Sequence, residues 1–323
     1  MQNWGKNFGL VELRRTPITD TATAQHLTDG RLIPLTDEVA IPCDTYRTLE
    51  PWKRAAARAF AVGLTCDKAV VSGQSAARLT GLETLDIEDR TELQLPGANK
   101  PHGPGTWHAN VRYRSTQLPE GQIEEHHGIR VTSLVRTLFD VPRFHGLRAG
   151  VVTIDSARRQ KPWLTRSTLS QKLAAYPPFP GVRAVRQAIN MSVGNSGSAQ
   201  ETIARLVLLE ADLPQITSIE YQVEIIYDNG RRSFFVDILL NGWLIIEIDG
   251  ANKYTGFYGK KTDKVLLEER ARENILKNEG RQVLRFSAPD LKQDPDGDCV
   301  MLRAVADTLD NYVDRLVALA QPR

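Results

Sequence analysis

Three acidic side chains lie in an otherwise apolar stretch of the second half of the chain, where they could hold a metal ion. From Arg232 to Asp249 the sequence is RSFFVDILLNGWLIIEID, and its acids are Asp237, Glu247 and Asp249. An ionised carboxylate in a hydrophobic hairpin costs several kcal/mol unless it has a partner. The composition of this stretch therefore suggests a divalent cation as that partner.

The loop of this predicted β-hairpin decides which acids share a face. A two-residue Asn-Gly loop would mix polar and apolar residues on both faces. A three-residue loop, an Asn-Gly turn with a glycine bulge, pairs Leu240 with Leu244 and sets Asp237 opposite Glu247. Because that register separates the acids from a fully apolar face, we predict the three-residue loop. The predicted apolar face consists of Val236, Ile238, Leu240, Leu244, Ile246 and Ile248.

The segments around the hairpin predict a mixed α/β (α+β) sheet flanked by helices. A helix in SAQETIARLVLLEADLP starts with Ser198 and Glu201 at capping-box spacing and ends before Pro214. EYQVEIIYDNG begins a three-strand meander with two Asn-Gly turns. The charged segment KVLLEERARENILKNEG predicts a helix that ends at Gly280, followed by the strand QVLRF.

The chain of 323 residues is long enough for more than one domain. The breaker clusters YPPFPG and SVGNSGS bracket a short basic helix, and we place the main boundary at the second cluster. We expect a winged-helix-like region over residues 1–60, a small α/β region with a helical linker over 61–194, and a further domain over 195–323. In the first region a helix, a tight turn and a strand pair follow one another, as they do in a winged helix.

Charge, cysteine and histidine usage exclude several classes of protein. The 41 basic and 39 acidic residues give a net charge of +2, so whole-chain charge offers no argument for nucleic acid binding. Cys43, Cys66 and Cys299 lack metal or disulfide spacing and are expected to be free thiols in a reducing cytoplasm. All six histidines lie in the first half, so histidine-dependent chemistry is not expected in the second. Without a leader-like start or a long apolar run, we expect a soluble cytoplasmic protein with no membrane contact.

The order of motifs in the second half resembles that of the PD-(D/E)xK nuclease superfamily, and more narrowly its very-short-patch-repair-endonuclease-like branch. The match runs from about Ser198 to Leu291: Ser-x-x-Glu, Val-Asp, Glu-x-Asp-Gly, a charged helix with Glu-x-x-x-x-Glu, then Gly-x-x-Val-Leu-Arg-Phe. The resemblance implies a restriction-endonuclease-like fold in which Asp237, Glu247 and the carbonyl of Ile248 bind Mg²⁺ or Mn²⁺. Hard oxygen ligands suit these ions better than zinc.

The third position of the family motif differs in this chain. Where the family carries lysine, two residues after Glu247, the chain has Asp249, which cannot donate a hydrogen bond to the attacking water or offset phosphate charge but could help to hold a second metal. Lys253 follows at a position where relatives carry histidine or lysine. We expect Lys253 to supply the missing positive charge, with Lys264 as the reserve.

Other charged residues have both a functional and a structural interpretation. Glu201 either joins the catalytic site or only caps its helix. The lysines of GKKTDK beside a metal site favour contact with the DNA backbone over simple solvation. Instead of binding a metal, Asp237 and Glu247 could form structural ion pairs with arginines such as Arg232. The predicted nucleic-acid-binding residues are Lys260, Lys261, Lys264, Arg270 and Arg285.

The first half resembles AbiEi-type antitoxin and regulator proteins over roughly residues 61–160. The segments that carry the resemblance are SGQSAARLTGL and GIRVTSLVRTLFDV. The resemblance implies a winged helix followed by an α/β region. ITDTATAQHLTDG carries no arginine or lysine, so DNA reading and protein contact both remain open for the first helix.

Together these observations predict a metal-dependent DNA endonuclease. The N-terminal half would position it on double-stranded DNA or on a protein partner, or would form a homodimer. The alternative is a DNA-binding regulator whose nuclease fold is catalytically inactive, with Asp249 as the defect. RNA cleavage, which would use the same carboxylates, is a third hypothesis.

Overall fold

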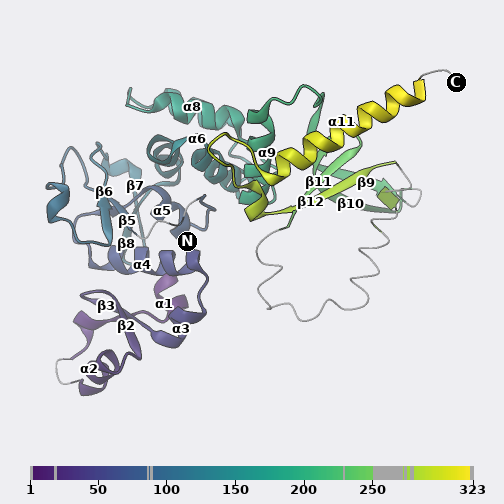
Figure 1. Ribbon diagram of the computed structural model, residues 1–323. Coiled ribbons are helices and arrows are strands. Elements are labelled where there is room, and N and C mark those ends of the chain that lie inside the picture. Colours follow the sequence, from purple (N-terminus) through teal and green to yellow (C-terminus); the bar gives the residue numbers. More distant parts are fainter. Residues whose placement is uncertain are drawn as a thin grey trace. The chain divides into compact units, whose positions relative to one another are not determined.

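The computed structural model describes residues 3–17, 20–85, 87, 90–227, 230–249, 272, 275–276 and 280–320 (Figure 1). It is a mixed α/β molecule, as predicted. The chain forms two compact units, Met1–Ser192 and Val193–Arg323, here called the N-terminal and C-terminal units. The division falls at the start of the SVGNSGS cluster.

The N-terminal unit starts with short helices around a three-stranded antiparallel sheet of order β1-β3-β2. The helices are α1 (Trp4–Phe8), α2 (Thr21–Thr28) and α3 (Cys43–Thr48). The strands are β1 (Val11–Glu12), β2 (Leu32–Thr36) and β3 (Val39–Pro42).

A five-stranded sheet of order β6-β5-β4-β8-β7 forms the rest of this unit, together with five helices. The strands are β4 (Val70–Val71), β5 (Thr91–Gln94), β6 (Val111–Tyr113), β7 (Ile123–His126) and β8 (Ile129–Thr132). The helices are α4 (Pro51–Thr65), α5 (Gly73–Leu79), α6 (Leu134–Gln160), α7 (Arg166–Ala174) and α8 (Val182–Met191).

Helix α4 joins the two sheets of the N-terminal unit into one hydrophobic core. Small residues along the helix let both sheets approach it, and Phe60 is 1% exposed in the same core. The same core contains Ile41 from β3 and Val131 from β8. A Cβ atom added at Gly63 would lie 3.1 Å from Ile129, so a larger residue at this position would push its neighbours apart by a few tenths of an ångström. Helix α4 spans the predicted boundary between residues 60 and 61. The residues before and after that boundary therefore share one hydrophobic core.

The C-terminal unit is a four-stranded sheet of order β12-β11-β10-β9 covered on one face by two helices. The first three strands along the chain are antiparallel, and β12 is parallel to β11. The strands are β9 (Ile219–Tyr227), β10 (Arg232–Leu240), β11 (Leu244–Asp249) and β12 (Gln282–Ser287). The helices are α9 (Ala199–Ala211) and α11 (Val300–Ala320).

Apolar residues of α9, α11 and the sheet form the main core of this unit. Val207, Ile246 and Val305 are each completely buried in it. Burying such a side chain stabilises a fold by about 1.5–3 kcal/mol. Among the described helices, none combines the length and the apolar character needed to cross a lipid bilayer.

Candidate functional site

The hairpin loop has the predicted three residues. Leu240 pairs with Leu244, which confirms the register, and the φ angles of Asn241 and Gly242 are 52° and 73°. Asparagine and glycine tolerate this left-handed backbone better than other residues. The side chain of Asn241 also accepts hydrogen bonds from two backbone amides just before β9, at 2.7 and 3.1 Å. The turn is therefore fixed by its backbone and by its side chain.

Strands β9 and β10 change faces at Gln222 and Asp237, which lie opposite each other. Gln222 has a φ of 49°, and no Cα pairing joins it to Asp237, although the pairs on both sides keep one register. Ile238 contributes to the core under α9 and α11, whereas Val236 packs with Leu239 in the cluster on the other face. The prediction that Val236 shares a face with Ile238 is wrong: the two side chains belong to different hydrophobic clusters, and the left-handed residue Gln222 of β9 lies beside the position where β10 changes faces.

Asp237 lies at this crossover, and its carboxylate is oriented by two hydrogen bonds. The backbone N–H of Ile248 donates to Oδ2 at 2.8 Å, and the side-chain amide of Gln222 donates to Oδ1 at 3.2 Å. The first bond reaches across from β11 and ties Asp237 to the residue after Glu247. For Ile248 the contact is thus made through its amide N–H, while the prediction for its carbonyl stays a prediction.

Glu201 on α9 is brought to the same place as Asp237. The Gln222 amide nitrogen that donates to Asp237 also donates to Oε2 of Glu201, at 2.8 Å. Burial raises the pKa of Glu201, and the negative charge of Asp237 raises it further. Both acids line a small cavity of about 10 Å³, roughly the room that one water molecule needs.

Glu201 also caps its helix, so its two interpretations are compatible. The Ser198 hydroxyl accepts a hydrogen bond from the Glu201 backbone N–H at 3.2 Å. The Glu201 carboxylate accepts one from the N–H of Gly197 at 2.7 Å. This is a capping box displaced by one residue. The cap uses one oxygen of Glu201, the same oxygen that Gln222 approaches.

Glu247 is paired with Arg272, a residue that the sequence analysis did not single out. Arg272 donates to Oε1 of Glu247 at 2.5 Å and to the carbonyl of Phe235 at 2.9 Å. Its guanidinium also lies 4.5 Å from the ring centroid of Phe234. The signal in the sequence was the run ERARE, but without the phase of the helix Arg270 and Arg272 were equivalent candidates.

Asp249 and Arg285 end up on neighbouring strands. Asp249 is the last residue of β11 and lies opposite Ser287 of β12, whereas Arg285 lies opposite Glu247 and is exposed. Exposure of Arg285 leaves it accessible to a phosphate group. The predicted residues Lys253, Lys260, Lys261, Lys264 and Arg270 lie outside the described residues.

Two described acids of the C-terminal unit, Glu201 and Asp237, lie at one cavity. Within the described part of the chain, no group of three or more histidine, cysteine, aspartate or glutamate side chains converges on one point. Glu201 and Asp237 border one cavity, and the negative charge of Asp237 adds to the effect of burial in raising the pKa of Glu201, so these two carboxylates are the described side chains that could hold a cation. Glu247 already has a cation beside it, the guanidinium of Arg272.

A second cluster of buried charges lies in the N-terminal unit. Glu92 on β5 is 1% exposed, and it pairs with Arg114 and His145, both at 2.8 Å. Burial raises the pKa of Glu92, but the hydrogen bonds and charges of His145 and Arg114 outweigh it and hold the pKa below the usual value. Its Oε1 also accepts from the N–H of Gln74 at the start of α5. This acid is fully provided with partners.

The sequence alone does not predict this cluster. Its members come from three separated segments of the chain, and Glu92 is the one charged residue of the sequence ELQLP. The sequence offered one signal, the glycine of SGQSAARL. In the structure a Cβ atom at Gly73 would lie 2.6 Å from Oε2 of Glu92, so glycine is needed where the carboxylate meets the helix.

Comparison of the chain with models of known protein families finds no match, and a search of curated proteins also finds none.

Proposed function

We propose that the C-terminal unit is a metal-dependent nuclease that hydrolyses phosphodiester bonds in double-stranded DNA. The observation that carries this proposal is the convergence of Glu201 and Asp237 from a helix and a strand onto one cavity, with one amide of Gln222 between them. Two carboxylates in one place raise the free energy of the fold unless a cation neutralises them. Such an arrangement is typical of sites that use the acids for chemistry.

The residues of the unit support this chemistry in distinct ways. Asp237 is oriented by the N–H of Ile248, which leaves Oδ1 directed toward the side that Glu201 occupies. Together these two carboxylates would hold Mg²⁺ or Mn²⁺. When bound, such an ion activates a water molecule and offsets negative charge on the phosphate.

Arg272 fits the role that the nuclease resemblance gives to lysine. Asp249 stands at the lysine position, but Arg272 places a permanent positive charge on the neighbouring acid, Glu247, at 2.5 Å. Guanidinium groups bind phosphate oxygens well. We therefore propose that Arg272 faces the scissile phosphate, together with the exposed Arg285, and that Lys253 and the lysines of GKKTDK extend the DNA contact. The N-terminal unit would hold the protein on DNA or on a protein partner.

The test is nicking of supercoiled plasmid by the full chain in Mg²⁺ or Mn²⁺. We expect the wild type to nick the plasmid, and Asp237→Ala to lose at least about a hundredfold in rate because the cation loses one ligand. Asp307→Ala removes an exposed acid on α11 and should leave the rate unchanged. Nicking by Asp237→Ala at the wild-type rate would contradict the assignment.

A DNA-binding regulator without nuclease activity is the second candidate, and one observation favours it. In the described part of the chain the acids form a pair and no larger group. A wild type that binds duplex DNA in a mobility-shift assay but cleaves neither DNA nor RNA in either metal would support the regulator over the nuclease.

A further inference from the structure

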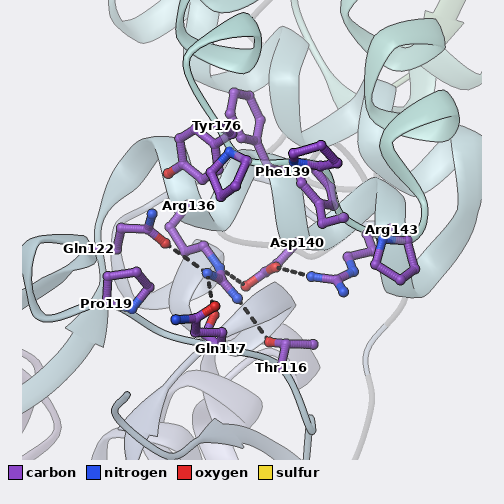
Figure 2. Close-up of a pocket in the computed structure, with 13 residues that line it drawn as sticks. Thr116, Gln117, Pro119, Gln122, Arg136, Phe139, Asp140, Arg143 and Tyr176 are labelled. Atoms are coloured by element: carbon purple, nitrogen blue, oxygen red, sulfur yellow. Dashed lines mark hydrogen bonds and ion pairs between the residues drawn. The ribbon is translucent and has the colours of Figure 1, made fainter. Parts of the chain in front are cut away.

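A separate cavity of about 240 Å³ lies within the N-terminal unit (Figure 2). One wall is the segment 176–180, the tyrosine, prolines and phenylalanine of the YPPFPG cluster, and Phe139 of α6 adds a further ring. Charged residues of α6 line another part of the cavity, namely Arg136, Asp140 and Arg143. An apolar cavity with a few polar groups is the usual construction of a small-molecule site.

Arg136 is committed to the protein. It is 5% exposed, and its guanidinium donates five hydrogen bonds of 2.7–2.9 Å, which is the full number of its N–H groups. The acceptors are the carboxylate of Asp140, the carbonyl of Gln117 and the side chains of Gln94, Thr116 and Gln122. Figure 2 shows it at the centre of this network. Arg136 therefore positions Asp140 and has no donor left for a ligand.

Arg143 has the opposite character. Its side chain is only 13% exposed, and its guanidinium lies 4.9 Å from the ring centroid of Phe144 and 5.1 Å from that of Phe179. Its nearest acid is Asp140, with 3.9 Å between Nη1 and Oδ1, which is too long for a hydrogen bond. This guanidinium donates no hydrogen bond to any residue in the described part of the chain. A planar donor fork thus faces the cavity, held by two rings.

Among the described arginines and carboxylates around the cavity, one positive charge is in excess. Arg136 and Asp140 balance each other at 2.7 Å, and nearby Arg114 is balanced by Glu92 at 2.8 Å. Arg143 is left over, and burial lowers its pKa, with the charge of Arg136 acting in the same direction against Asp140. Arginine nevertheless stays charged in proteins. A ligand that brings a single negative charge would complete the site, whereas a dianion would overload it beside Asp140.

We propose that this cavity binds a small monocarboxylate with an aromatic body. Its carboxylate would accept two hydrogen bonds from Arg143, a geometry that arginine favours. Its ring would lie against Phe139, Tyr176 and the prolines of the YPPFPG cluster. The site lies in a different unit from the proposed nuclease centre, so the proposal is independent of that function.

The test is titration of the full chain with three matched probes, followed by calorimetry or ligand-observed NMR. Phenylacetate is expected to bind, and neutral phenylacetamide to bind about tenfold or more weakly, because a hydrogen bond to a charged group is worth more than one between neutral groups. Benzylphosphonate, which keeps the methylene of phenylacetate, is expected to bind more weakly than phenylacetate at a pH above its second pKa, where it is a dianion. Equal affinity for phenylacetate and phenylacetamide, tighter binding of the phosphonate than of phenylacetate, or no binding of phenylacetate would each overturn the proposal.

Variants locate the binding. Arg143→Gln should weaken phenylacetate binding by about 10- to 100-fold, since the charge-assisted pair is lost. Arg143→Lys keeps the charge without the planar fork and should give an intermediate loss. Arg186→Gln removes an exposed arginine of α8 and should bind as the wild type does. Wild-type affinity in either Arg143 variant would contradict the assignment, and the lysine variant provides this test if the glutamine variant does not fold.

Discussion

Two glutamates, one in each unit, meet opposite electrostatic surroundings. Glu92 in the N-terminal unit faces Arg114 and His145, and these partners hold its pKa low despite burial. In the C-terminal unit, burial raises the pKa of Glu201, and the charge of Asp237 raises it further. The first acid therefore stabilises the fold in its ionised form, whereas the second costs stability at neutral pH. The comparison distinguishes acids that support the fold from acids that are kept for another purpose.

The largest expected effect comes from neutralising the supporting acid. Glu92→Gln should lower the free energy of unfolding of the N-terminal unit by about 3–5 kcal/mol, because it leaves the mostly buried guanidinium of Arg114 without its counter-charge. The stabilisation from Glu92 is present above its unfolded-state pKa and is lost as pH falls through its lowered folded-state pKa. The variant should therefore lose most at neutral pH and less in acid. Urea unfolding read by hydrogen exchange of each unit measures this.

A surface pair provides the control for Glu92. Glu120 is 76% exposed on its side chain and pairs with Arg130 at 2.8 Å. Exposed pairs of this kind contribute little, so Glu120→Gln should leave stability almost unchanged. A loss at Glu92 no greater than the loss at Glu120 would show that the buried network is not the main support of this unit.

A smaller loss is expected when the amide between the two C-terminal acids is removed. Gln222→Met deletes the hydrogen bonds to Glu201 and Asp237, and bonds to charged groups contribute about 1.5–3 kcal/mol. We expect unfolding of the C-terminal unit to become easier by about 2 kcal/mol at pH 7. Below the raised pKa of Glu201 the loss should shrink, because a protonated Glu201 no longer repels Asp237. Gln282→Met, at an exposed position of β12, is the control, and an equal loss at both pH values would contradict the repulsion.

The smallest effect should have the opposite sign. Glu201→Gln is expected to leave the C-terminal unit as stable as the wild type at pH 7, or more stable by up to about 1 kcal/mol, because it removes a buried charge and keeps an acceptor for Gly197. The wild type should lose stability as pH rises from the unfolded-state pKa through the raised folded-state pKa, and the variant should not. Thermal melts across pH measure both. Glu210→Gln on the exposed face of α9 is the control, and clear destabilisation by Glu201→Gln would remove the contrast with Glu92.

The sequence predicted local features well and long-range partners poorly. The three-residue loop followed from period-two patterning and from the backbone preferences of Asn241 and Gly242, both of which act within a few residues. The pairing of Glu247 with Arg272 depends on the phase of a helix that patterning alone does not fix. The face change at Gln222 was missed because glutamine carries no preference for a positive φ.

In the same way, the charged networks of the N-terminal unit could not be predicted. Arg136 and Asp140 have a spacing of four residues, which any exposed helical ion pair also has. Only the fold shows that the pair is buried, and that Arg143, one turn later, is left without an equivalent partner. Spacing therefore identifies possible pairs, but the surroundings decide their energetic role.

The crossover at Gln222 and Asp237 also sets a limit for protein engineering. A strand graft assumes that side chains alternate between the two faces of the sheet along the whole strand. Val236 and Ile238 break this pattern, because they pack into different hydrophobic clusters although they are two residues apart. A hairpin tip transplanted from beyond this point would carry its inward and outward pattern intact. A longer graft would need the left-handed residue as well, or half of its side chains would arrive facing the wrong way.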